Sequence, residues 1–154
     1  MKARITLLTL IVVLLGMMAY AADDPNMGTW KLNEGKSKIE AGTAKNTTVV
    51  YAADGDNVKV TTDGVDGSGK TTHSEWSGKF DGKAYPVTGD PNVDTRTYKK
   101  VNDRTMEITN KKGDKVTTTG KIVVAKDGKS RTVNTHGTTS DGKKVDNTYM
   151  YDKQ

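Results

Sequence analysis

The sequence contains no cysteine, one phenylalanine, two tryptophans and three prolines in 154 residues. Without cysteine the chain has no disulfide, no thiol nucleophile and no attachment point for a lipid on a cysteine near the N-terminus. Large apolar side chains are also scarce after residue 21, where Leu32 is the single leucine and Phe80 the single phenylalanine. A chain this polar cannot fill a large dry core, which favours a thin sandwich or a barrel with a partly polar interior.

The first 21 residues differ from the rest. Lys2 and Arg4 precede a nearly continuous apolar run from residue 5 to 15, and small residues follow at Ala19 and Ala21. This order predicts a helical secretory signal peptide, residues 1–21, that is cleaved after Ala21. The apolar run of about ten residues is half the length that a membrane-spanning helix needs. We therefore expect one domain, residues 22–154, that is periplasmic or secreted and has no membrane span after cleavage.

The charge of the mature chain is mild. Two of the 24 basic residues lie in the predicted signal, so 22 basic residues face 19 acidic ones, a net charge of +3. The signs are interspersed, as in the segment 111–115, whereas proteins that bind nucleic acids concentrate their basic residues on one face. We therefore expect a solvated surface and no nucleic-acid partner, with a loose attraction to an anionic envelope surface left open. The domain is expected to be a monomer.

Short segments of alternating polarity, separated by glycine turns, predict strands. Thr and Val fit pleated, half-buried surfaces, and Asp-Gly pairs such as 54–55, 81–82 and 127–128 suit tight hairpin turns. Nine strands are predicted, at 28–32, 47–51, 57–61, 71–76, 95–101, 105–110, 116–124, 131–135 and 145–151. The stretch around Pro86 and Pro91 is predicted to be an ordered loop or an edge. The pattern indicates an all-β, antiparallel meander that closes as a barrel or a sandwich.

The segment from Gly28 to Leu32 (Gly-Thr-Trp-Lys-Leu) resembles the Gly-x-Trp opening of the calycin barrels, the lipocalins and fatty-acid-binding proteins. The segment 147–153 is similar to their closing strand, which carries an aromatic residue near its end. The mature length and the segment 81–92 resemble small exported lipocalin-like proteins of bacteria. The resemblance implies an up-and-down, lipocalin-like barrel of about eight to ten strands, with a ligand in its interior.

This implied barrel gives Trp30 and Tyr149 expected places. Trp30 shares a face with Leu32, and we expect it to be a structural plug, because a large aromatic side chain fills a barrel end well. Calycin barrels usually hold an arginine of the last strand over this tryptophan. Tyr149 occupies that position here, so an aromatic pair is expected to replace the cation–π contact.

Four residues are candidates for ligand binding: Trp76, Arg96, Tyr98 and Tyr149. If their strand faces point inward, the guanidinium can pair with a carboxylate while the rings bury the remainder of an amphipathic or anionic molecule. The alternative is that Arg96 and its neighbours face water, because arginine is rarely buried without a partner.

Catalytic and metal-binding patterns are weak. His73 and His136 are the only histidines, and no Gly-x-Ser-x-Gly elbow is present. The segment 64–71 matches the spacing of a phosphate-binding loop, but a strand is predicted after it where that loop needs a helix. We interpret the segment as a hairpin turn. The Asp-rich segments 54–57 and 63–66 lack the distal glutamate of an EF-hand, so no metal site and no cofactor is predicted.

Three functions remain open. The first is a small exported barrel, not an enzyme, that binds a small amphipathic or anionic molecule in its interior. The alternative is a non-enzymatic structural or protein-interaction module of the envelope or extracellular space, with a filled core. The third is a hydrolase or isomerase, which needs His, Asp or Glu side chains converging inside the barrel. The first is preferred through the resemblance, since a fold alone does not determine function.

Overall fold

The computed structural model describes residues 24–139 and 141–154, so the predicted signal peptide lies outside the described residues. The described chain forms ten strands and one short 3-10 helix, η1 (Glu34–Lys36). The strands are β1 (Gly28–Leu32), β2 (Lys45–Asp54), β3 (Asn57–Val65), β4 (Thr71–Gly78), β5 (Asp81–Thr88), β6 (Thr95–Asn102), β7 (Thr105–Lys112), β8 (Lys115–Val124), β9 (Ser130–Thr138) and β10 (Lys144–Lys153).

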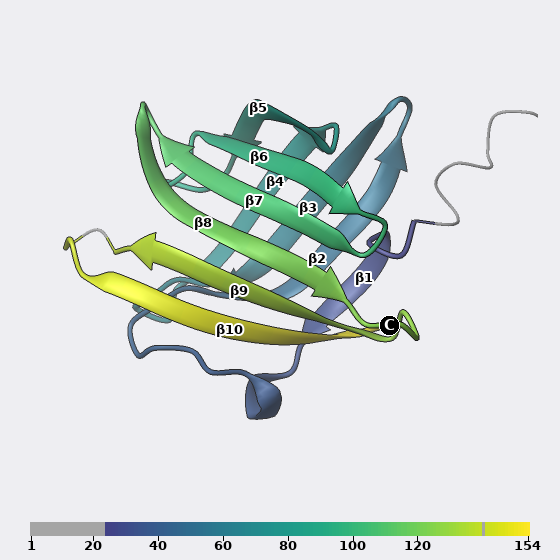
Figure 1. The fold of residues 1–154 in the computed structure, drawn as a ribbon. Coiled ribbons are helices and arrows are strands. Elements are labelled where there is room, and N and C mark those ends of the chain that lie inside the picture. The colour runs from purple at the N-terminus through teal and green to yellow at the C-terminus, as the bar shows by residue number, and fades with distance from the viewer. Residues whose placement is uncertain (1–23, 140) are drawn as a thin grey trace, which may run out of the picture.

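The ten strands form a closed antiparallel barrel. Each strand pairs with the next one in sequence, and β1 pairs with β10 to complete the closure. Figure 1 shows β6–β10 crossing in front of β1–β5, so the barrel has two curved walls. The predicted all-β, up-and-down barrel is confirmed. Ten strands lie within the expected range, and the closed barrel is consistent with a calycin-like fold.

The structure adds one strand that the sequence pattern did not predict. Residues around Pro86, predicted as a loop or an edge, belong to β5. Only two residue pairs join β4 to β5, Glu75 with Thr88 and Trp76 with Val87. Proline has no N–H to donate to a ladder, and β5 is accordingly weakly paired on its β4 side. The expectation of an edge was therefore partly right, while the expectation of a loop was wrong.

The interior of the barrel is divided along its axis. The half next to the β6–β7 and β8–β9 connections is apolar, and its side chains are almost completely buried. It contains Trp30, Tyr51, Met106, Ile122, Val124 and Tyr151. Alternate residues of each strand face inward, so the predicted pairing of Trp76 with Ser74, and of Met106 with Ile108, on common faces is confirmed.

The opposite half is lined by hydrogen-bonding side chains. Seven strands each contribute one such inward-facing residue, and all seven lie in the half of their strand nearer to the β3–β4, β7–β8 and β9–β10 turns. We call this set the polar lining: Thr62, Ser74, Arg96, Asn110, Thr118, Thr135 and Asn147. Register pairs connect its members into three groups, Thr62–Ser74, Arg96–Asn110–Thr118 and Thr135–Asn147.

The long connection between β1 and β2 packs along β10 at the polar end. Lys38 forms an isolated bridge with Thr148, and the backbone N–H of Glu40 donates to Oδ1 of Asn147 at 2.7 Å. The connection also touches the β3–β4 turn, since a Cβ placed on Gly67 would clash with the carbonyl oxygen of Gly42. These contacts hold residues 38–44 against the barrel wall.

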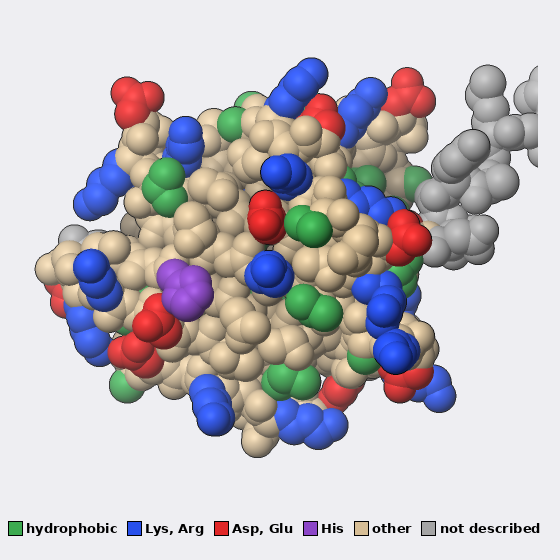
Figure 2. Space-filling model, viewed as in Figure 1, with side chains coloured by type: hydrophobic (Ala, Val, Ile, Leu, Met, Phe, Trp, Pro, Cys, Tyr) green, Lys and Arg blue, Asp and Glu red, His purple; other side chains and the backbone are tan. Residues whose placement is uncertain are grey.

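The outer surface carries charges of both signs. On β6, β7 and β8, Lys99, Glu107 and Lys121 are register partners in one row, and Figure 2 shows acidic and basic side chains interspersed over this face. Across the described ranges, no helix has the length and hydropathy needed to cross a membrane.

Candidate functional site

The site begins with Trp30, whose indole lies completely buried in the apolar half of the barrel. Its Nε1–H donates to the carbonyl oxygen of Asn26 at 2.9 Å. The guanidinium of Arg131 lies 4.7 Å from the centre of its ring. The expectation that Tyr149 replaces this cation was wrong, because the arginine comes from β9 instead of β10. Arg131 is the register partner of Tyr151, which places it beside the end of β10 that pairs with β1.

Arg131 is the most unusual charge in the barrel. Its side chain is 2% exposed, and its guanidinium also lies 4.9 Å from the ring centres of both Tyr51 and Tyr151. Its Nε and Nη1 groups are buried and make no hydrogen bond to the described part of the protein. Three aromatic faces therefore replace the water that a guanidinium normally keeps, through the attraction between a cation and ring quadrupoles.

Three of the four predicted ligand-binding residues lie together. Trp76 and Tyr98 pack edge-to-face with ring centres 4.8 Å apart, and the indole Nε1–H of Trp76 donates to the backbone oxygen of Arg96 at 3.0 Å. Phe80 stacks on Trp76, and Tyr51 contacts Tyr98, so these rings form one aromatic cluster. Trp76 and Tyr98 are almost fully buried, so they fill the interior as core residues.

Arg96 faces inward and is 6% exposed, which is the predicted inward arrangement rather than the alternative of an arginine facing water. Its Nε donates to Oδ1 of Asn110 at 2.7 Å, and its guanidinium lies 5.9 Å from the ring centre of Tyr98. Burial and the neighbouring Tyr51 hydroxyl raise the pKa of Tyr98 far above its usual range, so its phenol stays neutral. The Tyr98 and Tyr51 hydroxyl oxygens are 3.5 Å apart.

Tyr149 lies apart from this cluster. It is half-buried on β10, and its hydroxyl donates to the carbonyl oxygen of Ala44 at 3.1 Å. Tyr151 makes the equivalent contact with the carbonyl oxygen of Asn46 at 2.9 Å. The two phenols thus connect β10 to the start of β2, which is a structural task. The role of Tyr149 in ligand binding stays a prediction.

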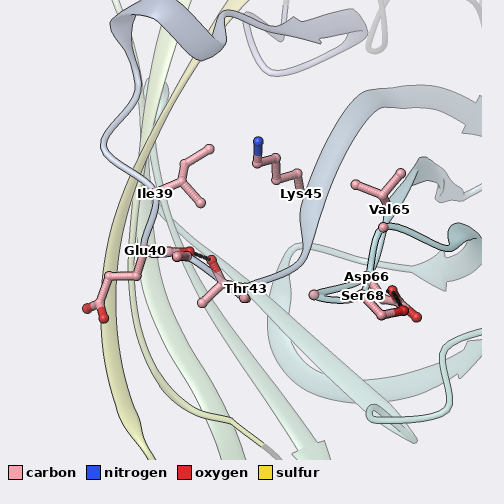
Figure 3. Close-up of a pocket in the computed structure, with 11 residues that line it drawn as sticks. Ile39, Glu40, Thr43, Lys45, Val65, Asp66 and Ser68 are labelled. Atoms are coloured by element: carbon pink, nitrogen blue, oxygen red, sulfur yellow. Dashed lines mark hydrogen bonds between the residues drawn. The ribbon is translucent and has the colours of Figure 1, made fainter.

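A groove of about 410 Å³ lies between residues 39–45 and the β3–β4 turn. Figure 3 shows Ile39, Lys45 and Val65 around its opening. Its polar groups already have partners, since Lys45 pairs with Glu34 at 2.6 Å and Thr43 donates to the carbonyl oxygen of Glu40. A second groove, of about 180 Å³, lies beside the β2–β3 turn. Neither is lined by the predicted ligand-binding residues.

The segment with phosphate-loop spacing is the β3–β4 turn, as interpreted from the sequence. Oδ1 of Asp66 accepts hydrogen bonds from the backbone N–H groups of Ser68 and Lys70, at 2.9 and 3.0 Å. These are amides of the kind that a phosphate would use, and strand β4 follows directly at Thr71. A carboxylate therefore occupies the turn from within the chain.

Both histidines lie on the outer face, each paired with an aspartate directly across the sheet. Nδ1 of His73 is 2.6 Å from Oδ1 of Asp63, and Nδ1 of His136 is 2.6 Å from Oδ1 of Asp146. Within residues 24–139 and 141–154, no histidine or carboxylate is buried inside the barrel, and no three metal-ligating side chains of this kind come together.

The sequence analysis missed Arg131 and Asn110 as interior residues. Alternation within the predicted strand 131–135 places Arg131 on the same face as Val133, which was the available signal. The residue that faces Trp30 depends on the stagger between strands, and no sequence pattern of single strands reveals that stagger.

In the comparisons with known proteins, neither a family model nor a curated protein matches this chain.

Proposed function

We propose that this chain is an exported binding protein, not an enzyme, whose barrel takes up a small anionic molecule at the polar lining. The closed barrel is a fold compatible with ligand binding. Export is supported by the three-part pattern of residues 1–21, and the expected destination is the periplasm or the extracellular space. Intact mass of the mature protein tests the export step, with a chain beginning at Ala22 as the expected result.

The observation that carries this proposal is the sign of the charges inside the barrel. Arg96 and Arg131 are the buried charged residues of the described chain, and no buried carboxylate accompanies them. Neither arginine takes part in any ion pair among the described residues. An ion removed from water without a counter-ion loses several kcal/mol of hydration, so an anion entering the barrel gains an unusually strong attraction.

Arg96 is the better anchor of the two. The rings of Trp30, Tyr51 and Tyr151 already surround Arg131, whereas Arg96 has the amide of Asn110 and a more distant tyrosine ring. Arg96 also belongs to the polar half, where its neighbours can donate further hydrogen bonds. A guanidinium presents several N–H groups in one plane and so suits a carboxylate.

Titration calorimetry on the mature protein tests the proposal with carboxylates and cations of matched size. The probes are octanoate, dodecanoate, gluconate and glucuronate, set against octylammonium, dodecyltrimethylammonium and glucosamine. We expect at least one carboxylate to bind and the cations to bind at least tenfold more weakly. Arg96→Met removes a charged hydrogen-bond partner, so it should weaken carboxylate binding by about tenfold or more.

Lys99→Met is the matched control for this variant. It removes the same charge from the same strand, but Lys99 is exposed on the outer face and should change affinity less than twofold. Binding of no carboxylate, equal binding of cations, or equal losses in the two variants would each overturn the proposal.

The second candidate is a structural or protein-interaction module with a filled core. It is favoured by the aromatic cluster around Trp76, which packs closely within the apolar half, and by the position of both grooves away from the four predicted ligand-binding residues. The same titrations decide between the two candidates, because a module of this kind binds none of the small probes.

A further inference from the structure

We infer that the anion this barrel takes is a hydroxylated carboxylate of the sugar-acid class, and not a fatty acid. This inference rests on the proposed function and specifies its ligand. It follows from the way in which the interior is divided between rings and hydrogen-bonding groups.

The apolar half offers little room for an acyl chain, because its own aromatic side chains pack against one another there. Trp76 and Tyr98 are each almost fully buried, and ring centres within the cluster are 4.8–6.3 Å apart. Arg131 lies against this cluster through Tyr51 and also contacts the rings of Trp30 and Tyr151. An acyl chain entering this half would have to displace closely packed rings, at the cost of their dispersion contacts.

The polar half presents the opposite chemistry. Seven of the ten strands place a hydroxyl, amide or guanidinium group toward the axis, as defined by the polar lining. Hydrocarbon placed against these groups would remove them from water without offering hydrogen bonds in return, which costs free energy for each group. A ligand with several hydroxyls can satisfy them.

Three members of this lining keep partial exposure. Asn110, Thr118 and Thr135 are half-buried, although they alternate along their strands with the buried, inward-facing residues Met106, Ile122 and Arg131. Their side chains therefore lie on the inward face of the wall and keep partial exposure, unlike the inward residues of the apolar half. A ligand entering from the polar end meets hydroxyl and amide groups first and the guanidinium of Arg96 beside them, since Arg96, Asn110 and Thr118 are consecutive register partners.

The two chemistries together select the ligand class. The guanidinium of Arg96 can pair with one carboxylate. The hydroxyl and amide groups on the neighbouring strands can form hydrogen bonds with donors and acceptors spaced along a short polar chain or ring. A polyhydroxy carboxylate supplies both within a molecule of about a dozen heavy atoms. A fatty acid supplies the carboxylate alone.

The experiment compares gluconate and glucuronate with octanoate and dodecanoate by titration calorimetry on the mature protein. We expect at least one sugar acid to bind ten times more tightly than either fatty acid. Thr118→Val and Thr135→Val remove one hydroxyl each at nearly constant volume. Each should weaken sugar-acid binding about three- to tenfold and leave any fatty-acid binding unchanged.

Thr119→Val is the matched control, because Thr119 is exposed on the outer face of the same strand as Thr118. It should change no affinity by more than twofold. If fatty acids bind more tightly than sugar acids, or the inward and outward threonine variants behave alike, this inference is wrong while the proposed function stands. If no carboxylate binds at all, the proposed function fails with it.

Discussion

Replacement of Arg131 tests whether aromatic rings compensate a buried charge in this barrel. Three ring centres lie 4.7–4.9 Å from the guanidinium. At about 2 kcal/mol for each desolvated ring, their combined attraction is about 6 kcal/mol. Removing the guanidinium from water, with Nε and Nη1 left without hydrogen-bond partners, costs about 4 kcal/mol. The attraction of the rings therefore exceeds the desolvation cost by about 2 kcal/mol. We expect Arg131→Met to lower the free energy of unfolding by this amount.

Arg131→Lys separates charge from shape. An ammonium keeps the positive charge but is more strongly hydrated than a guanidinium and cannot lie flat against three rings. It retains most of the desolvation cost and loses much of the ring attraction, so we expect it to be less stable than Arg131→Met. The predicted order of stability is wild type, then methionine, then lysine.

Urea unfolding, followed by tryptophan fluorescence and circular dichroism, measures these differences from the transition midpoints. Lys153→Met is the control, because Nζ of Lys153 lies 5.2 Å from the Trp30 ring but the residue is only half-buried. It should cost less than about 1 kcal/mol. A lysine variant as stable as the methionine variant, or a methionine variant as stable as the wild type, would refute the compensation by aromatic rings.

Two further predictions concern the polar end. Gly67→Ala should destabilise the protein by about 1–3 kcal/mol in thermal unfolding, because its Cβ would clash with the carbonyl oxygen of Gly42. Gly35→Ala is the control and should be nearly neutral, because its Cβ would meet no atom closer than 3.7 Å. Equal effects of the two variants would contradict the close packing at Gly67. The hydrogen bond to Asp63 raises the pKa of His73, so its stabilisation is present below the ordinary histidine pKa and is lost as pH rises through the raised value. The stability difference between wild type and His73→Asn should therefore shrink from pH 5.5 to pH 8.5 in urea unfolding, and a constant difference would argue against the pair.

Most of the strands could be predicted because side chains that face inward and outward alternate along the sequence of each strand. In the segment 71–76, successive side chains alternate between the two faces of the strand. The structure places Ser74 and Trp76 inside and His73 outside. β5 escaped the same reasoning, because Pro86 interrupts the pattern and the strand barely pairs with β4.

The interior site was predicted only in part. Alternation grouped Arg96 with Tyr98 on one face, and the burial of both side chains confirmed that this face points inward. Alternation could not identify Arg131 as the cation over the Trp30 ring, because that contact depends on how far each strand is displaced along its neighbour. The division of the interior into two halves depends on all ten displacements at once, so it becomes visible only in the assembled barrel.

The pairing of the first strand with the last has a consequence for when the molecule can fold. β1 lies against β10, and the N–H of the final residue, Gln154, donates to the carbonyl oxygen of Thr29. A growing chain leaves this edge of β1 unpaired until β10 has been synthesised. The barrel can therefore close only after all ten strands have been made, because the last contact to form joins the two ends of the described sheet.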